Sequence, residues 1–572
     1  MNIDLKDKYT LSKGFRFLTG SQALVRVPIV QNRRDKKKNI NSAGYISGYR
    51  GSPLGNYDKQ VSQNKKYLEK YNIHFQPGIN EELAATSIWG TQQLNFYGEG
   101  KFDGVVGIWY GKGPGVDRSG DALKHANLAG TSEKGGVLAL MGDDHTCESS
   151  SNLHQSEFAM VDAMIPILNP SGVQEILDYG IFGIELSRLS GSWVGIKCVH
   201  DNVSSAATVD LNEDRVSIID VDKNFIPKDG LNIRKNDTPQ NRENRLHYHK
   251  LAVVKEFCRV NKLNKYIYNS TNAKIGIVTT GKSFLDTMQS MEKLGIDEMA
   301  ANKVGIKLLK IAMPWPLEAK IIEEFSQNLD LIIVIEEKRS LIESQIKEIL
   351  FNKNPSLKII GKSDLDGDTL FPSSGALNPG YIATKIGPLI YKNNPNAELK
   401  SKIDTLNKIV KEKRSVTDVK RTPYFCSGCP HNTSTQIPEG SRAITGISCA
   451  YLVQNMERNN EGFTHMGSEG ATWVGESIFS NRDHLFQNLG DGTYIHSGIL
   501  SIRHAVAAKT KITFKILYND AVALTGGQPL DGSPSVAQIS QQLAAEGVKK
   551  IAIISDEPNK YSNKEIFAKN SK

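Results

Sequence analysis

Several features are scarce in this sequence, and each scarcity narrows what the protein can be. The 572 residues contain only six cysteines, too few and too scattered for the disulfide framework of a small secreted protein. No apolar run reaches the roughly 18 residues that a membrane-spanning helix needs. The first residues, Met1 to Asp7, lack the apolar core of a signal peptide. We therefore expect a cytoplasmic protein with no membrane partner.

A strong excess of one charge is also missing. Lysine and arginine number 70 and aspartate and glutamate 62, which gives a net charge of +8 on a long chain. The one concentrated basic run, residues 33–38 (Arg-Arg-Asp-Lys-Lys-Lys), fits the solvated end of a helix better than a nucleic-acid-binding surface. The sequence thus predicts no nucleic-acid partner.

What the sequence does contain is alternation between short apolar strands and amphipathic helices. This pattern is typical of α/β domains built on parallel sheets, and the length allows about three or four domains. Residues 1–210 and 422–572 each show the pattern, and residues 270–390 contain a compact βαβαβα unit. The polar stretches 211–269 and 391–421 are predicted to be linkers.

The most informative stretch runs from residue 486 to residue 521. An apolar strand, residues 486–489, ends in Gly490-Asp491-Gly492, and a second strand, residues 512–518, ends at Asn519. The carboxyl ends of neighbouring parallel strands are where open α/β sheets bind ligands. A carboxylate, an amide oxygen and a backbone carbonyl suit Mg²⁺. The spacing resembles the metal-diphosphate motif of thiamine-diphosphate (ThDP) enzymes, although a lone Gly-Asp-Gly is more often a plain turn.

Three of the six cysteines lie close together. Cys426 and Cys429 form a Cys-x-x-Cys followed by Pro430 and His431, and Cys449 comes 20 residues after Cys429. A zinc site would need His431 or a distant residue as its fourth ligand. A redox pair would use Cys426 and Cys429 and leave Cys449 idle. A [4Fe–4S] cluster would use all three thiolates, and the nearby ThDP motif favours it because a cluster accepts electrons one at a time. The other three cysteines, Cys147, Cys198 and Cys258, are predicted to be buried small residues.

ThDP chemistry also needs a carboxylate that hydrogen-bonds the aminopyrimidine ring and promotes proton removal. In this class of enzyme the carboxylate comes from a different domain than the metal motif. The helix start Asn80-Glu81-Glu82 fits this role. The alternative is an acidic side chain that only complements the positive end of the helix dipole.

Seven segments carry a resemblance to a known family. They are residues 19–26, 47–55, 109–118, 142–145, 425–430, 488–494 and 518–529. Through them the chain resembles the 2-oxoacid:ferredoxin oxidoreductases, closest to the N-terminal part of the bacterial indolepyruvate ferredoxin oxidoreductases whose subunits are fused into one polypeptide. The likeness extends over nearly the whole chain. It implies a multidomain α/β fold with a pyrimidine-side ThDP domain (1–210), a transketolase-C-like βαβ domain (270–390) and a diphosphate-side ThDP domain (422–572).

The resemblance also assigns roles to individual residues. Glu81 matches the pyrimidine glutamate, and Ser52 and, more weakly, Arg50 are expected near the substrate carboxylate. The remaining matches are Gly490, Asp491, Gly492, Asn519 and the carbonyl of Ala521 at the Mg²⁺-diphosphate site, and Cys426, Cys429 and Cys449 as the first three cluster ligands.

The implied activity is oxidative decarboxylation of a 2-oxo acid, with indolepyruvate or another aryl pyruvate favoured. Coenzyme A would accept the acyl group, and ferredoxin would receive the electrons through the cluster. The family's fourth cluster cysteine lies beyond the Gly-Gly-Gln segment, whereas this sequence has no cysteine after Cys449. We therefore expect a fragment, or a subunit that assembles as a homodimer or with a chain carrying the missing cysteine and a γ-type domain. The alternatives are a ThDP decarboxylase that releases an aldehyde, an inactive partial chain, and a structural zinc site.

Overall fold

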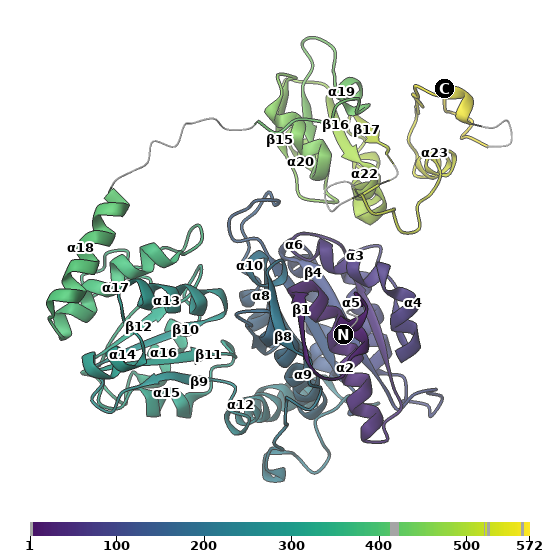
Figure 1. The fold of residues 1–572 in the computed structure, drawn as a ribbon. Coiled ribbons are helices and arrows are strands. Elements are labelled where there is room, and N and C mark those ends of the chain that lie inside the picture. The colour runs from purple at the N-terminus through teal and green to yellow at the C-terminus, as the bar shows by residue number, and fades with distance from the viewer. Residues whose placement is uncertain (1–3, 412–421, 520, 523–526, 562–565) are drawn as a thin grey trace. The chain divides into compact units, whose positions relative to one another are not determined.

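The computed structural model describes residues 4–411, 422–519, 521–522, 527–561 and 566–572 (Figure 1). The chain divides into two compact units, a first unit of Met1–Val416 and a second unit of Thr417–Lys572. Each unit is built on parallel β-sheets. Within the described residues, no helix is long and apolar enough to cross a membrane.

The first unit begins with a six-stranded, fully parallel sheet in the order β3-β2-β4-β5-β7-β6. Its central strands are apolar and buried on both faces, as parallel strands covered by helices must be. Helices α2 and α9 cover one face, and α5 and α7 cover the other. The strands are β2 (Ser42–Gly48), β3 (Ile73–Phe75), β4 (Gly104–Lys112), β5 (Val137–Asp143), β6 (Ile167–Leu168) and β7 (Val194–Val199), and the helices are α2 (Gly20–Lys37), α5 (Glu81–Gln92), α7 (Gly120–Ala129) and α9 (Val173–Ser190).

A two-stranded antiparallel sheet closes this domain, because β1 (Phe15–Thr19) pairs with β8 (Ala206–Asp210). Helix α2 starts directly after β1 in a capping box, in which the Thr19 hydroxyl accepts the Gln22 N–H and the Gln22 side chain accepts the Thr19 N–H. The basic run at the end of α2 is only partly solvated. The three lysines of the run are exposed at the end of α2, as predicted. Asp35 alone departs from the prediction, because it is buried and accepts two hydrogen bonds from Arg188, at 2.7 and 2.8 Å.

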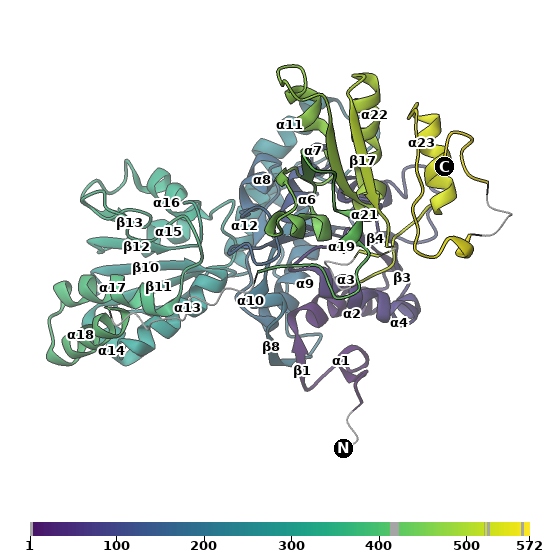
Figure 2. The ribbon, with the colours of Figure 1, turned by 90° about the horizontal axis from the view of Figure 1, so that it is seen from above.

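The second sheet of the first unit has the order β13-β12-β10-β11-β9, with only β9 antiparallel. The predicted βαβαβα unit is confirmed, and β9 joins it from the stretch predicted as a linker. Figure 2 shows α13 and α17 on one side of this sheet and α15 and α16 on the other. The strands are β9 (Lys265–Asn269), β10 (Ile275–Thr280), β11 (Ile306–Ile311), β12 (Leu331–Ile335) and β13 (Lys358–Ile360), and the helices are α13 (Gly281–Lys293), α14 (Glu298–Val304), α15 (Ala319–Phe325), α16 (Ile342–Leu350), α17 (Pro379–Asn393) and α18 (Ala397–Lys411).

Shorter helices complete the first unit. Helix α12 packs its buried Val254 and Phe257 into the core of the six-stranded sheet, although it also lies in the predicted linker. These helices are α1 (Asp7–Thr10), α3 (Gly55–Gln63), α4 (Lys65–Leu68), α6 (Gly113–Arg118), α8 (Glu157–Asp162), α10 (His200–Val203), α11 (Pro239–Asn244) and α12 (Leu251–Val260).

The second unit contains a four-stranded parallel sheet in the order β15-β14-β16-β17. Helices α20 and α22 bury Trp473 and Ile502 against one face of it. The elements are α19 (His431–Ser434), β14 (Ala443–Thr445), the 3₁₀-helix η4 (Ser448–Asn455), β15 (Asn460–Phe463), α20 (Ala471–Glu476), β16 (Leu485–Gly490), α21 (Asp491–Thr493), α22 (Ile499–Ala507), β17 (Ile512–Leu517) and α23 (Val536–Ala545). The predicted α/β class with several parallel sheets is confirmed.

Candidate functional site

The strand order of the second unit defines a ligand-binding edge. From β14 the chain moves outward to β15 on one side, and from β16 it moves outward to β17 on the other. The order therefore reverses between β14 and β16, and open α/β sheets bind ligands in the crevice at the carboxyl ends of the two strands flanking such a switch point. In the parallel pairing of β16 with β17, Gly490 lies opposite Leu517. Asp491 and Asn519 thus follow neighbouring strands at the same edge, as the sequence predicts.

Asp491 is held at this edge by backbone hydrogen bonds. Its side chain is only 3 % exposed. Oδ1 accepts the N–H of Gly492 at 2.7 Å, and Oδ2 accepts the N–H of Asn519 at 2.8 Å. The Asn519 side-chain oxygen accepts the N–H of Ala521 at 3.2 Å. Each of these oxygens has a second lone pair, so the donor set fits a hard cation such as Mg²⁺.

The three cysteines lie in the same unit. The N–H of Cys429 donates to the carbonyl of Cys426 at 3.0 Å, in a turn where Gly428 has a φ of +76°. Burial raises the pKa of the Cys449 thiol, and Cys429, Cys426 and Asp491 raise it further, which places the three thiols and Asp491 within electrostatic range of one another. Among the described residues, no group of three or more His, Cys, Asp or Glu side chains forms a ready metal site. The choice of a cluster over zinc stays a prediction.

His431, which the sequence offered as a zinc ligand, is buried at the start of α19. Its ring packs edge-on against Phe425, with centroids 5.8 Å apart. Burial lowers the pKa of His431, and the charge of Asp491 acts in the opposite direction. The structure therefore places His431 near the predicted metal-diphosphate residues.

Glu81 occupies the corresponding edge of the six-stranded sheet in the first unit. Helix α5 begins there because the Asn80 side chain accepts the N–H of Leu83 at 2.9 Å. Glu81 is 6 % exposed, and its backbone carbonyl accepts the indole N–H of Trp109 at 2.9 Å. Its carboxylate packs on Gly115, where an added Cβ would lie 2.4 Å from Oε1. The structure thus brings Glu81 together with the glycine-rich motif 109–118.

Arg50 and Ser52 follow β2, the strand next to β4. Arg50 is buried, and its Nε lies 3.9 Å from Oδ2 of Asp58, which also accepts a 2.6 Å hydrogen bond from the Tyr110 hydroxyl. Ser52 is half-buried in the turn after β2. Both residues therefore lie at the carboxyl edge predicted for substrate binding, and Arg50 already faces a carboxylate.

A buried ionic cluster at the ends of β5 and β7 was missed. Lys197 forms an ion pair with Glu157 and lies 3.9 Å from Oδ2 of Asp143. Asp143 accepts hydrogen bonds from the Ser156 N–H at 2.9 Å and hydroxyl at 2.5 Å. Burial raises the pKa of Asp143 to about 6. The motif 142–145 pointed to Asp143, but nothing in the apolar stretch around Lys197 signals its partners.

The same motif contacts the second sheet of the first unit. Lys338, after β12, donates a 2.5 Å hydrogen bond to the backbone carbonyl of His145. Burial, together with the charges of nearby lysines, lowers the pKa of His145 well below its usual value, so its imidazole is neutral. Cys147, two residues on, is half-exposed in a left-handed conformation with a φ of +60°, so the prediction of a buried cysteine was wrong there. Cys198 and Cys258 are buried, as predicted.

A segment of the first unit, and most of the chain with it, is similar to known proteins. Residues 265–413 match the family model described as the indolepyruvate oxidoreductase domain. Subunit IorA of indolepyruvate oxidoreductase from Methanothermobacter marburgensis is 24% identical over 548 residues, covering 93% of this chain and 79% of the relative. The resemblance to the indolepyruvate oxidoreductases is confirmed.

One further relative and two solved structures also match this chain. The IorA subunit from Pyrococcus abyssi is 23% identical over 546 residues, covering 90% of this chain and 76% of that one. A solved 2-oxoglutarate:ferredoxin oxidoreductase from Magnetococcus marinus superposes with a TM-score of 0.49 at 16% identity, over 66% of each chain. A split gene transketolase gives 0.37 at 10% identity, over 69% of this chain and all of the other.

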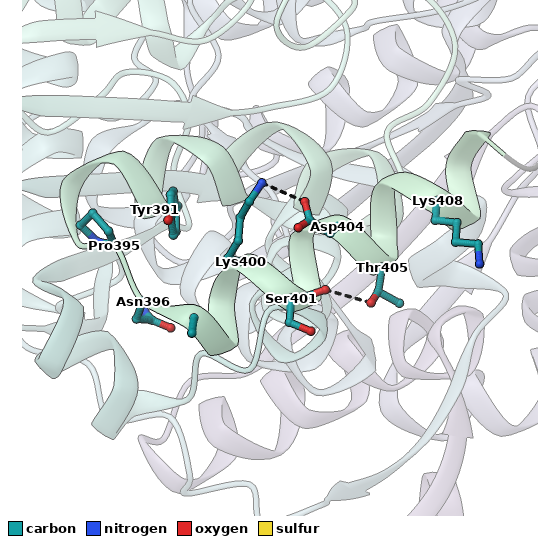
Figure 3. A pocket seen from close by; sticks show the side chains of 9 residues that line it. Tyr391, Pro395, Asn396, Lys400, Ser401, Asp404, Thr405 and Lys408 are labelled. Atoms are coloured by element: carbon teal, nitrogen blue, oxygen red, sulfur yellow. Dashed lines mark hydrogen bonds and ion pairs between the residues drawn. The ribbon is translucent and has the colours of Figure 1, made fainter.

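The region matched to the indolepyruvate oxidoreductase domain also carries a surface pocket of about 790 Å³ (Figure 3). It lies beside the turn between α17 and α18, where Lys400 and Asp404 form an ion pair of 2.9 Å on α18. None of the residues predicted to act in catalysis lines it. The lining residues are Tyr391, Pro395, Asn396, Ala397, Lys400, Ser401, Asp404, Thr405 and Lys408.

Proposed function

We propose that this chain is a ThDP-dependent subunit of an enzyme that oxidatively decarboxylates a 2-oxo acid to an acyl-CoA and CO₂. Indolepyruvate or another aryl pyruvate is the proposed substrate, and ferredoxin is the proposed electron acceptor. The observation that carries the proposal is the pairing of Asp491 with Asn519 at the switch point of the second unit. The similarity to IorA subunits over 93% of the chain supports it.

The residues of the second unit fit a magnesium-bound diphosphate. Asp491, Asn519 and the carbonyl of Ala521 would hold Mg²⁺, and Gly490 and Gly492 would let the backbone approach the phosphates. Hard oxygen ligands that leave positions open for phosphate and water are what Mg²⁺ prefers. ThDP, when bound, supplies the carbon nucleophile that allows a 2-oxo acid to lose CO₂.

The residues of the first unit would orient the reacting groups. The buried carboxylate of Glu81 would hydrogen-bond the aminopyrimidine and hold its proton, a role that suits a carboxyl group shielded from water. Ser52 and Arg50 would orient the substrate carboxylate, with Arg50 shared between the substrate and Asp58. The domain limits 1–210, 270–390 and 422–572 belong to this proposal, as does a cytoplasmic location.

The electron path would begin at the cysteines. Cys426, Cys429 and Cys449 would supply three thiolates of a [4Fe–4S] cluster, which suits three thiols within electrostatic range of one another. A partner polypeptide with a γ-type domain would supply the fourth ligand. The working enzyme would therefore be a homodimer of this chain or a complex with that partner.

The decisive experiment is an anaerobic one. The chain is purified alone and with the product of the neighbouring gene, and iron, zinc and substrate-dependent viologen reduction are measured. The proposal expects iron in a brown protein, and reduction that requires ThDP, coenzyme A and the aryl pyruvate. Zinc without iron would overturn the cluster, and an aldehyde product without viologen reduction would favour a non-oxidative decarboxylase. An Asp483→Asn variant, which changes an exposed aspartate just before β16, serves as a control that keeps activity.

A further inference from the structure

A second buried carboxylate lies at the switch-point edge of the second unit, and no motif predicts it. Glu469 is in the loop between β15 and α20 and is 0 % exposed. One carboxylate oxygen, Oε2, accepts the N–H of Gly467 at 2.8 Å. The other, Oε1, is buried and has no hydrogen-bond partner among the described residues. A buried polar atom without a partner is costly, and its presence calls for an explanation such as a bound ligand.

The side chain of Glu469 packs against Gly446, the first residue after β14. An added Cβ at Gly446 would lie 2.3 Å from Oε1 and 2.5 Å from Cγ of Glu469. Gly446 directly follows β14, which pairs with β16, the strand that presents Asp491. The absence of a side chain at Gly446 therefore makes room for the carboxyl group at the end of one of the two strands that flank the switch point.

The surroundings of Glu469 disfavour a negative charge. Burial raises the pKa of the Glu469 carboxyl to about 7 and outweighs the backbone N–H groups that act to lower it, which are those of Glu469 itself, Gly467, Ile447 and Ser468. The titratable groups on its own loop and on the neighbouring elements are His465, Cys449 on η4, Asp491 after β16, and Arg442 and Glu476, which pair with each other at 2.6 Å. A second anion brought to this edge would favour the neutral carboxyl further, because like charges oppose each other's ionisation.

We propose that Glu469 is a further residue of the diphosphate site, where its carboxyl group is neutral in the complex and Oε1 donates a hydrogen bond to the bound anion. The inference rests on the proposed function. Where the Glu469 carboxyl is ionised in the free protein, it takes up one proton from solvent when the diphosphate binds and returns it to solvent when the diphosphate leaves. A neutral carboxyl donates a hydrogen bond to phosphate, whereas an ionised one would repel it.

The test is to count protons taken up as ThDP binds to the full-length chain. Binding is measured by calorimetry in excess Mg²⁺, in pairs of buffers with different ionisation enthalpies, at pH 6 and pH 8. The variant Glu469→Gln keeps the shape and can donate a hydrogen bond, but it cannot titrate. Glu457→Gln, which changes an exposed glutamate of the same unit, is the matched control. The ligand's own phosphate titrates equally in all three proteins and cancels in the difference.

The proposal predicts that the native protein and E457Q take up about 0.9 proton more than E469Q at pH 8, and about 0.1 more at pH 6. It also predicts that native affinity falls about tenfold more than that of E469Q between these pH values. Equal proton uptake by native protein and E469Q, with ThDP bound to both, would overturn the role of Glu469 alone. No binding to the native protein would overturn the proposed function as well. If E469Q does not fold, an uptake by native protein that is no larger at pH 8 than at pH 6 still overturns the inference.

Discussion

The carboxyl edges of two parallel sheets, one in each unit, manage buried charge in different ways. At the edge of the six-stranded sheet, Lys197 lies between Glu157 and Asp143, so side chains of the protein itself neutralise the carboxylates. At the edge of the four-stranded sheet, Asp491 accepts the N–H of Gly492 and Asn519, and Glu469 accepts that of Gly467. Backbone N–H groups orient a carboxylate but bring no net positive charge.

This difference separates an edge whose buried carboxylates have a cationic side chain as partner from one whose carboxylates have only backbone N–H groups. At the first edge, folding itself brings the ammonium of Lys197 to the buried carboxylates and neutralises them. The second edge lacks such a lysine at Glu469, whose oxygen remains unpaired within the described residues. A divalent cation at Asp491 and a proton at Glu469 would supply the missing positive charge. The comparison can be tested at either edge.

The largest effect is expected from Asp491→Asn. This change removes the charge that would draw Mg²⁺ to the second edge. It also replaces one of the two oxygens that accept backbone N–H groups with an NH₂ group, so only one of those hydrogen bonds is kept. We expect ThDP affinity to fall more than about 100-fold, which is about 2.7 kcal/mol of binding free energy. Tryptophan fluorescence or calorimetry in the presence of Mg²⁺ measures this directly. D483N should bind as the native protein does; tight Mg²⁺-dependent binding by D491N would show that the second edge does not need a cation there.

The next largest effect is expected from Lys197→Met in the first unit. Loss of the ammonium leaves Glu157 and Asp143 buried without their cation, and breaking such a pair costs about 3–5 kcal/mol of unfolding free energy. Denaturant unfolding followed by circular dichroism gives the value. Lys37→Met, which removes an exposed pair with Asp214, should cost less than about 1 kcal/mol. If the two variants lost the same stability, the first edge would not depend on its internal ion pair.

A smaller, pH-dependent effect is expected from Lys250 in the first unit. Backbone carbonyls hold this buried lysine, just as backbone N–H groups hold the buried carboxylates of the second unit. Its ammonium donates to the backbone carbonyls of Gly191 at 2.8 Å and Asn127 at 3.3 Å. Burial lowers the pKa of Lys250 from 10.5 to about 7. Between these values the unfolded chain binds more protons than the native one, so the free energy of unfolding rises with pH, by up to about 1.4 kcal/mol per pH unit.

The corresponding variant is Lys250→Met, measured by denaturant unfolding at pH 7.5 and 9.5. The variant should lose the rise in stability that the native protein shows over this range. An unchanged slope in the variant would mean that Lys250 keeps its proton in the folded state, and that backbone groups alone can hold a buried charge in the first unit.

Sequence patterns located most of the strands and placed Asp491 and Asn519 at neighbouring strand ends, because both depend on local signals. Strands β16 and β17 lie within one residue of the predicted limits 486–489 and 512–518, since each is a short apolar run with sharp boundaries. Helix α5 begins at the predicted helix start, but it ends at Gln92, whose side chain donates to the carbonyl of Val105 on β4. That contact is tertiary and leaves no local pattern.

The side chains that were missed share one property. Lys197 is a single charge in an apolar strand, and Glu469 is a single charge in a glycine-containing turn. Each becomes unusual only when packing removes it from water, and its partners lie 40 and 23 residues away, at Glu157 and Gly446. Such pairs have no fixed spacing, so the sequence gives no reason to separate them from surface residues. The same holds for Asp35 and Arg188.

The register that sets Gly490 opposite Leu517 restricts where residues can be inserted or deleted between β16 and β17. Asp491 and Asn519 are 28 positions apart, and a hydrogen bond joins them across two strand ends. If β17 slipped by one residue, Tyr518 would take the place of Asn519 and every side chain of the strand would change faces. A change in the turn before β17, near Lys509, that shifted this register by one residue would therefore separate Asp491 from Asn519 while leaving α22 and β17 themselves intact. We therefore expect homologues to conserve the number of residues between the two strand ends more strictly than the residue types.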